Sequence, residues 1–173
     1  MRRGLKCLCR LFCAVLALSL QTAPVSASPV APTGEAVPVL RLRVADAGGQ
    51  TRILLPLGNG STFAIRYIHS VARTPVEDWF AVNDNCLYLE KTVYQDFGAG
   101  LPHMPEGGQR MTTAGGHVII SGFHRALPRF DLRVGRIARH TLILPDAGGW
   151  REVPLDRVAP PGSALTFRMD DGR

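Results

Sequence analysis

Apolar and polar residues alternate along most of this sequence with a period of two, the pattern of a β-strand with one buried face. In residues 129–134, for example, phenylalanine, leucine and valine alternate with arginine and aspartate. Residues 40–44 and 63–69 follow the same pattern, and it returns at 142–144 and 165–169. Clusters of glycine, asparagine, aspartate and proline separate these runs at short intervals, so the spacing predicts antiparallel strands joined by hairpins.

The same pattern determines the expected fold class. No apolar stripe with helical spacing continues for ten residues or more without an interrupting glycine or proline. Hydrophobic residues make up 46% of the 173 residues, which is enough for a compact core. We therefore expect an all-β protein, an antiparallel β-sandwich or open barrel of about 8–11 strands with little or no helix.

The N-terminal residues have the pattern of a secretory signal peptide. A basic segment at 1–10 precedes an apolar run at 11–20, and small residues follow at 25–27. The apolar run is about half as long as the roughly 20 residues that a membrane-spanning helix needs, and an uncleaved anchor is the alternative. The expected organisation is a signal peptide at 1–27, a disordered Pro-rich lead-in at 28–36 and a single β domain at 37–170.

The charge of the chain is concentrated at its N-terminus. The formal net charge is +6, but four of the 20 basic residues lie in the first ten residues, which leaves 16 basic and 14 acidic residues. The remaining arginines alternate along strands instead of clustering. The sequence therefore predicts an exported protein with no nucleic-acid partner and, once the signal is removed, no stable membrane span.

The cysteines and histidines do not predict a metal or a cofactor. Three of the four cysteines lie in the expected signal peptide, so Cys86 would remain alone and could form no intramolecular disulfide. The histidines show none of the spacings typical of zinc sites. They are His69, His103, His117, His124 and His140.

The most unusual stretch is 67–79, which contains His69, Ser70, Arg73, Glu77 and Asp78. If 71–74 form a hairpin loop, an imidazole, a hydroxyl and one or two carboxylates meet at one end of a sheet. Such a cluster would suit a polar ligand, or a serine activated by a base. Adjacent strand residues point to opposite faces, however, so His69 is poorly placed to activate Ser70. The alternative is structural: the histidine and serine bond the turn backbone, and the carboxylates counter nearby arginines.

A second unusual stretch runs from Tyr94 to Pro102. Gly98 and Gly100 permit positive φ angles and a close approach of the backbone. The stretch lacks the lysine and the helix N-terminus of a phosphate-binding loop, which leaves a structural turn or a ligand loop. Strict alternation in the preceding strand predicts one polar, aromatic face, made of Tyr88, Glu90, Thr92 and Tyr94.

Two motifs carry a resemblance to a known family. HSVARTPVEDWF begins at His69, TVYQDFGAGLP begins at Thr92, and a His-Thr-Leu sequence follows at His140. Over about 40–167 the chain resembles a family of exported bacterial proteins, the domain-of-unknown-function 1850 family. The motif residues that match are His69, Ser70, Val71, Thr74, Pro75, Phe97, Gly98, Gly100, Leu101 and Pro102. Two positions depart from the family pattern: Asp78 stands where a glutamate is usual, and Lys91 stands where an acidic residue often precedes the threonine.

The resemblance implies a cellular context for the protein, but it does not imply a particular activity. Members of the family look like small envelope proteins that are often encoded beside TRAP-type transporters with a TAXI-class solute-binding protein. We therefore expect a periplasmic or secreted, non-enzymatic accessory protein whose partner is a TRAP permease or a TAXI solute-binding protein. The expected contact surface includes His69, Ser70, the loop at 73–78 and the loop at 98–102. The alternatives are a small-molecule binder or hydrolase that uses the His69 cluster, and a purely structural envelope domain.

Overall fold

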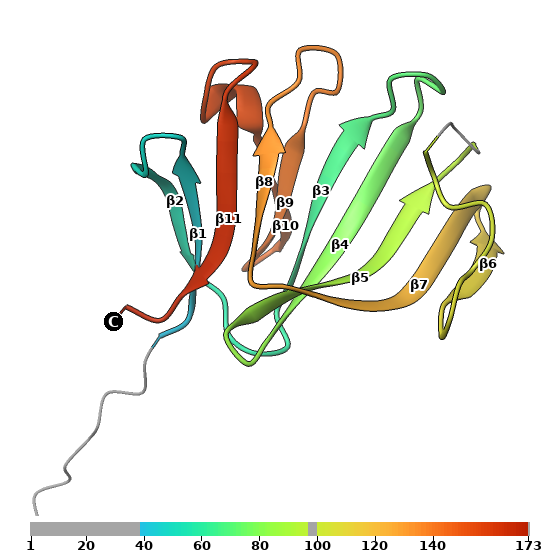
Figure 1. The fold of residues 1–173 in the computed structure, drawn as a ribbon, viewed down its shortest axis with the longest axis horizontal. Helices are drawn as coiled ribbons and strands as arrows, with labels where there is room; N and C mark the ends of the chain where they lie inside the picture. The colour runs from blue at the N-terminus through green and yellow to red at the C-terminus, as the bar shows by residue number, and fades with distance from the viewer. Residues whose placement is uncertain (1–38, 97–99, 173) are drawn as a thin grey trace, which may run out of the picture. The chain divides into compact units, whose positions relative to one another are not determined.

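The computed structural model describes residues 39–96 and 100–172, and Figure 1 shows that nearly all of this part is β-structure. The expected signal peptide and the whole of the expected lead-in lie outside the described residues. The strands are β1 (Arg41–Asp46), β2 (Thr51–Pro56), β3 (Thr62–Ile68), β4 (Pro75–Asn83), β5 (Cys86–Tyr94), β6 (Arg110–Ala114), β7 (His117–Leu127), β8 (Arg129–Arg133), β9 (Thr141–Asp146), β10 (Gly149–Pro154) and β11 (Ala164–Asp170). A single 3-10 turn, η1 (Leu155–Arg157), precedes β11.

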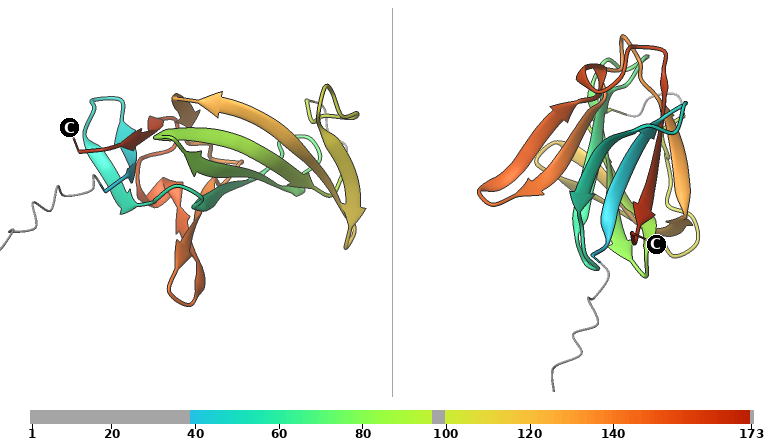
Figure 2. Two further views of the ribbon diagram at one scale, coloured as in Figure 1. Left: turned by 90° about the horizontal axis from the view of Figure 1, so that it is seen from below. Right: turned by 90° about the vertical axis from the view of Figure 1, so that its left-hand side faces the viewer.

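The strands form two antiparallel sheets. One has four strands in the order β2-β1-β11-β8, and the other has seven in the order β10-β9-β3-β4-β5-β7-β6. The small sheet packs against one part of the large sheet, and β5, β7 and β6 continue beyond it (Figure 1 and Figure 2). The predicted all-β, sandwich-like class is confirmed, with eleven strands in the described part of the chain.

Local sequence explains the strands and their turns. Leu42 and Val44 of β1 are fully buried, while the arginines between and before them are half-buried on the other face. The β4–β5 hairpin closes at Asp84 and Asn85, which have φ angles of 48° and 56°. Aspartate and asparagine tolerate this left-handed conformation better than other non-glycine residues, so the predicted turn forms at this point.

The main hydrophobic core lies between the two sheets and contains a ladder of four phenylalanines. Phe63 of β3 stacks on Phe80 of β4 with 5.1 Å between ring centroids. Phe80 stacks on Phe130 of β8 at 5.0 Å, and Phe130 stacks on Phe167 of β11 at 4.8 Å. The ladder therefore crosses from the large sheet to the small sheet and ties the two layers together.

A second, smaller core covers the part of the large sheet that extends past the small one. Its buried residues are Val76, Tyr94, Leu101, Val118 and Ile120. Leu101 belongs to the chain segment between β5 and β6, so this segment substitutes for the missing second layer. No helix in the described residues is long and apolar enough to cross a membrane.

A β-bulge in β5 corrects the predicted polar face of this strand. Leu89 pairs with Phe80 and Lys91 pairs with Trp79, so Glu90 is an extra residue that shifts the register. Alternation starts again after it, and Thr92 and Tyr94 are buried on the inner face, whereas Tyr88 lies on the outer face. The prediction that these side chains share one face is wrong, because a bulge inverts the alternation that follows it.

Candidate functional site

His69 caps the turn between β3 and β4. Its backbone N–H donates to the carbonyl of Thr74, and its carbonyl accepts from the N–H of Arg73, both at 2.9 Å. Its imidazole Nδ1 accepts the N–H of Ala72 at 3.1 Å and, less closely, that of Val71 at 3.4 Å. The side chain is buried, with 9% exposure. His69 therefore organises the turn backbone, as the structural alternative in the sequence predicted.

The predicted meeting of His69, Ser70, Glu77 and Asp78 does not occur. The strands pair up to Ile68 and Pro75, so His69 and the exposed Ser70 belong to the turn and lie opposite no carboxylate. Glu77 and Asp78 are adjacent in β4, and strand alternation sends them to opposite faces of the sheet. This geometry does not provide the base, nucleophile and orienting carboxylate that a base-activated serine requires.

Glu77 lies on the outer face of the large sheet and neutralises Arg66. Its carboxylate is 2.8 Å from Nε of Arg66, and Glu152 of β10 is 2.6 Å from a terminal nitrogen of the same guanidinium. Burial lowers the pKa of Arg66, but the two glutamates outweigh this effect and raise it. The indole N–H of Trp79 donates to the second oxygen of Glu77 at 3.0 Å. These contacts give Glu77 a structural role.

Lys91, which departs from the family pattern, belongs to the same outer face. Its ammonium nitrogen lies 4.7 Å from the ring centroid of Trp79. Trp79 also meets Trp150 of β10 edge to face, with 5.2 Å between centroids. A cation over an indole face is attractive, so Lys91 has a packing partner of its own on this face.

Asp78 lies on the inner face, where it accepts a hydrogen bond from a buried threonine. The hydroxyl of Thr92 donates to Oδ1 of Asp78 at 2.7 Å. Burial raises the pKa of Asp78, and the bond from Thr92 offsets only part of this rise. On the neighbouring strand, burial and then the charge of Asp78 raise the pKa of Tyr67 to about 12. Asp78 is therefore a carboxylate held where ionisation is costly.

This burial predicts the pH dependence of Asp78→Asn. Because the pKa of Asp78 is higher in the folded than in the unfolded chain, its ionisation destabilises the fold. The penalty is absent below the unfolded pKa of 3.8, grows as the pH rises through it, and is complete above the folded pKa. We expect Asp78→Asn to raise the melting temperature at pH 7 and to leave it nearly unchanged at pH 3, measured by circular dichroism. An equal loss of stability at both pH values would contradict this account.

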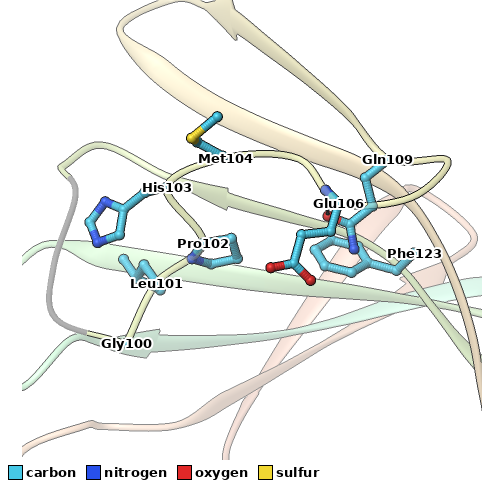
Figure 3. Close-up of a pocket in the computed structure, with 8 residues that line it drawn as sticks. All are labelled: Gly100, Leu101, Pro102, His103, Met104, Glu106, Gln109 and Phe123. Atoms are coloured by element: carbon cyan, nitrogen blue, oxygen red, sulfur yellow. Dashed lines mark hydrogen bonds between the residues drawn. The ribbon is translucent and has the colours of Figure 1, made fainter.

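Tyr94 and Gly100 position the segment between β5 and β6. Tyr94 is fully buried, and its hydroxyl donates to the carbonyl of Pro102. Gly100 has a φ of +88°, which glycine adopts without strain. Residues 100–109 then surround a pocket of about 590 Å³ whose lining includes Phe123 of β7 (Figure 3). Gly98 lies outside the described residues.

Arg73 contributes to a cluster that the sequence analysis missed. Arg73 of the β3–β4 turn and Arg136 and Arg139 of the β8–β9 loop line one pocket of about 470 Å³. We call these three residues the arginine end; both loops lie at the same end of the strands in Figure 1. The N–H of Ile68 donates to the carbonyl of Ala138 at 2.7 Å and joins the two loops. Arg73 and Arg136 are separated by 62 residues in sequence, so the strand order, and not local sequence, brings them together.

The arginine end combines positive charge with exposed aliphatic side chains. Among the described residues, no ion pair or side-chain hydrogen bond engages any of its three guanidinium groups. Val71 and Ile137, on the same two loops, are 68% and 57% exposed. Arg73 and Arg139 also have positive φ angles of 60° and 47°, a conformation uncommon outside glycine, asparagine and aspartate. Charged side chains without ion-pair partners, next to exposed apolar side chains, are typical of an interaction surface.

Metal-binding and cysteine chemistry have less support in the structure than the arginine end has. In the described ranges, no three His, Cys, Asp or Glu side chains come together as metal ligands would. Cys86 begins β5, is half-buried, and has its sulfur 3.5 Å from the carbonyl oxygen of Leu87. The site therefore consists of loops that present charge on a two-sheet β scaffold.

The fold and these loops define a β-sandwich-like protein with an arginine-rich end. The family model described as Domain of unknown function (DUF1850) matches residues 63–148, and the chain belongs to this family. The matched residues run from β3 to the β9–β10 turn and include the whole arginine end, Tyr67 and Asp78. No curated protein and no solved structure matches the chain.

Proposed function

We propose that this chain is an exported, non-enzymatic accessory protein of the bacterial envelope that docks onto a component of a TRAP-type transporter, either the permease or a TAXI-class solute-binding protein. The N-terminal pattern of a basic segment, an apolar run and small residues supports export. The family resemblance supports the transporter context, because its members are often encoded beside such transporters.

The arginine end is the observation that carries the docking proposal. Its three guanidinium groups have no ion-pair partner among the described residues, although arginines elsewhere in the same part of the chain, such as Arg52 and Arg66, pair with carboxylates. Arginine suits such a surface because its planar group binds carboxylates in a bidentate geometry. The partner surface is therefore acidic, with an apolar centre that covers Val71 and Ile137.

The position of His69 favours binding over hydrolysis. Its Nδ1 is engaged by the backbone of the turn, and this bond shapes the loop that presents Arg73. Ser70 lies exposed on the same turn and has no carboxylate opposite it. In this proposal the residues of the family motif serve to hold the loop in its docking conformation.

Charge reversal at the arginine end tests the proposal. The tagged full chain is expressed in its own host, cross-linked in the envelope and purified, and transporter components are identified by mass spectrometry. We expect Arg73→Glu, Arg136→Glu and Arg139→Glu together to reduce recovery at least about tenfold, since each lost charged contact costs about 1–3 kcal/mol.

A triple variant with the same change in charge provides the matched control. Arg110, Arg125 and Arg151 are exposed on β6, β7 and β10, and their replacement by glutamate should leave recovery unchanged. Equal recovery with both triple variants, equal loss with both, or the absence of any transporter component would refute docking through the arginine end.

A further inference from the structure

A small pocket lies under β8, the edge strand of the four-stranded sheet, and two of its lining residues, Tyr67 and His140, adjoin Ile68 and Arg139 of the pocket at the arginine end. It has a volume of about 210 Å³ and is bordered by β3 and β4 of the large sheet, β8 of the small sheet and His140, which precedes β9. Pockets for drug-sized ligands range from about 300 to 1,000 Å³, so this one suits a smaller molecule.

Aromatic rings form most of its walls. Phe80 and Phe130 stack at 5.0 Å with an angle of 11° between their planes. Tyr67 and His140 lie at 5.8 Å with their planes tilted by 41°. All four rings line the pocket. Phe80 and Phe130 are stacked on neighbours in the phenylalanine ladder, which leaves Tyr67 and His140 as the rings whose faces can meet a ligand. An aromatic face carries partial negative charge and attracts a cation more than a neutral molecule or an anion.

Asp78 provides a carboxylate in this aromatic pocket. Thr92 bonds its Oδ1, and the described residues provide no hydrogen-bond donor to Oδ2. Asp131 also borders the pocket, but its carboxylate accepts from the hydroxyl of Thr166 and lies 3.4 Å from Arg129. No lysine or arginine is among the residues that line the pocket, so nothing there neutralises Asp78.

His140 adds no positive charge. The N–H of Gly135 donates to its Nδ1 at 3.2 Å, which places the proton of the neutral ring on Nε2. Burial lowers the pKa of His140 and so favours this neutral form. The polar lining thus combines the two carboxylates of Asp78 and Asp131, one phenol and one neutral imidazole.

We infer that the pocket between β3, β4 and β8 binds a small organic ammonium ion, with Asp78 as the counter-charge and the ring of Tyr67 beside the cationic head. Carboxylates and aromatic faces together form the usual recognition site for amines and methylated amines. The pocket shares no lining residue with the pocket at the arginine end, and ammonium binding to Asp78 does not require docking to a transporter.

Isothermal titration of the purified full chain with choline and with ethylammonium tests the inference. The neutral isostere of choline, 3,3-dimethylbutan-1-ol, has the same shape without the charge. We expect at least one ammonium probe to bind at least about tenfold more tightly than the isostere, because the interaction is electrostatic. Absence of measurable binding of either ammonium ion at 10 mM would overturn the inference.

Variants locate the binding. Asp78→Asn should weaken ammonium binding at least about tenfold. Tyr67→Leu, which keeps an apolar side chain without the aromatic face, should weaken it about 2- to 30-fold. Glu106→Gln makes the same change of charge in the separate pocket at Phe123, and should have no effect. Unchanged affinity in Asp78→Asn, or an equal loss in Glu106→Gln, would contradict binding at this pocket.

Discussion

We expect Phe167→Ala to lower the free energy of unfolding by about 3–5 kcal/mol. Phe167 is fully buried at the centre of the small sheet, and its ring stacks on Phe130 with an angle of only 3° between planes. Truncation removes this contact and opens a cavity between the layers, where stiff strands on both sides restrict collapse. Urea denaturation followed by circular dichroism measures the loss.

Phe123→Ala is the matched control for this prediction. Phe123 is half-buried on β7 and packs against the second core, so its truncation leaves a partly solvated gap instead of a cavity. We expect it to cost less than half as much as Phe167→Ala. If the two substitutions cost the same, the phenylalanine ladder would not be the main link between the sheets.

The second large effect is expected for Tyr94→Ala, at about 3–5 kcal/mol. Tyr94 is among the largest fully buried side chains of the chain, and it anchors the segment from Gly100 to Gln109 through Pro102. Its loss should loosen this segment as well as the second core. Limited proteolysis of the folded protein should then cut within 100–109 at least about tenfold faster than in the wild type, since local opening governs cleavage.

Two further substitutions divide the effect of Tyr94 into packing and hydrogen bonding. Tyr94→Phe retains the ring and removes the hydroxyl, which should cost about 1–3 kcal/mol and produce part of the faster cleavage. Tyr88→Ala removes a tyrosine from the outer face of the same strand and should leave cleavage within 100–109 unchanged. Faster cleavage in Tyr88→Ala would show that general destabilisation of β5 is responsible.

The fold class could be predicted from the sequence because one face of each strand is more exposed to solvent than the other. Alternation in 129–134 and turn residues such as Asp84 and Asn85 indicate hairpins directly. The division into two sheets could not be predicted. The first strand, β1, pairs with the last strand, β11, and local sequence does not specify which distant strand will be the neighbour. The bulge at Glu90 also has no local signal, and it reversed the expected faces of Thr92 and Tyr94.

The candidate site could be predicted less well than the fold. The sequence correctly indicated that His69 could serve the turn, but proximity in sequence suggested a cluster with Glu77 and Asp78 that strand geometry separates. Arg73 was recognised without its partners, since Arg136 and Arg139 lie on another hairpin connection. Sites built from distant loops depend on strand order, which is a property of the whole chain.

The half-buried Asp78 and the exposed arginine end both lower the stability of the folded chain. An ionised carboxylate in an aromatic pocket is destabilising, and like charges at adjacent loop tips repel one another. Such features are characteristic of surfaces and pockets that acquire their partners from outside the chain.

The central proposal is docking through the arginine end. Site-specific photo-cross-linking tests it most directly. Replacement of Ile137 by p-benzoylphenylalanine places a photoreactive group at the arginine end, and the same replacement of Leu54, which is 47% exposed on β2, provides the control. In the native host, we predict that irradiation joins the Ile137 variant, but not the Leu54 variant, to a TRAP permease or TAXI solute-binding protein. No adduct from position 137, or equal adducts from both positions, would contradict the proposal.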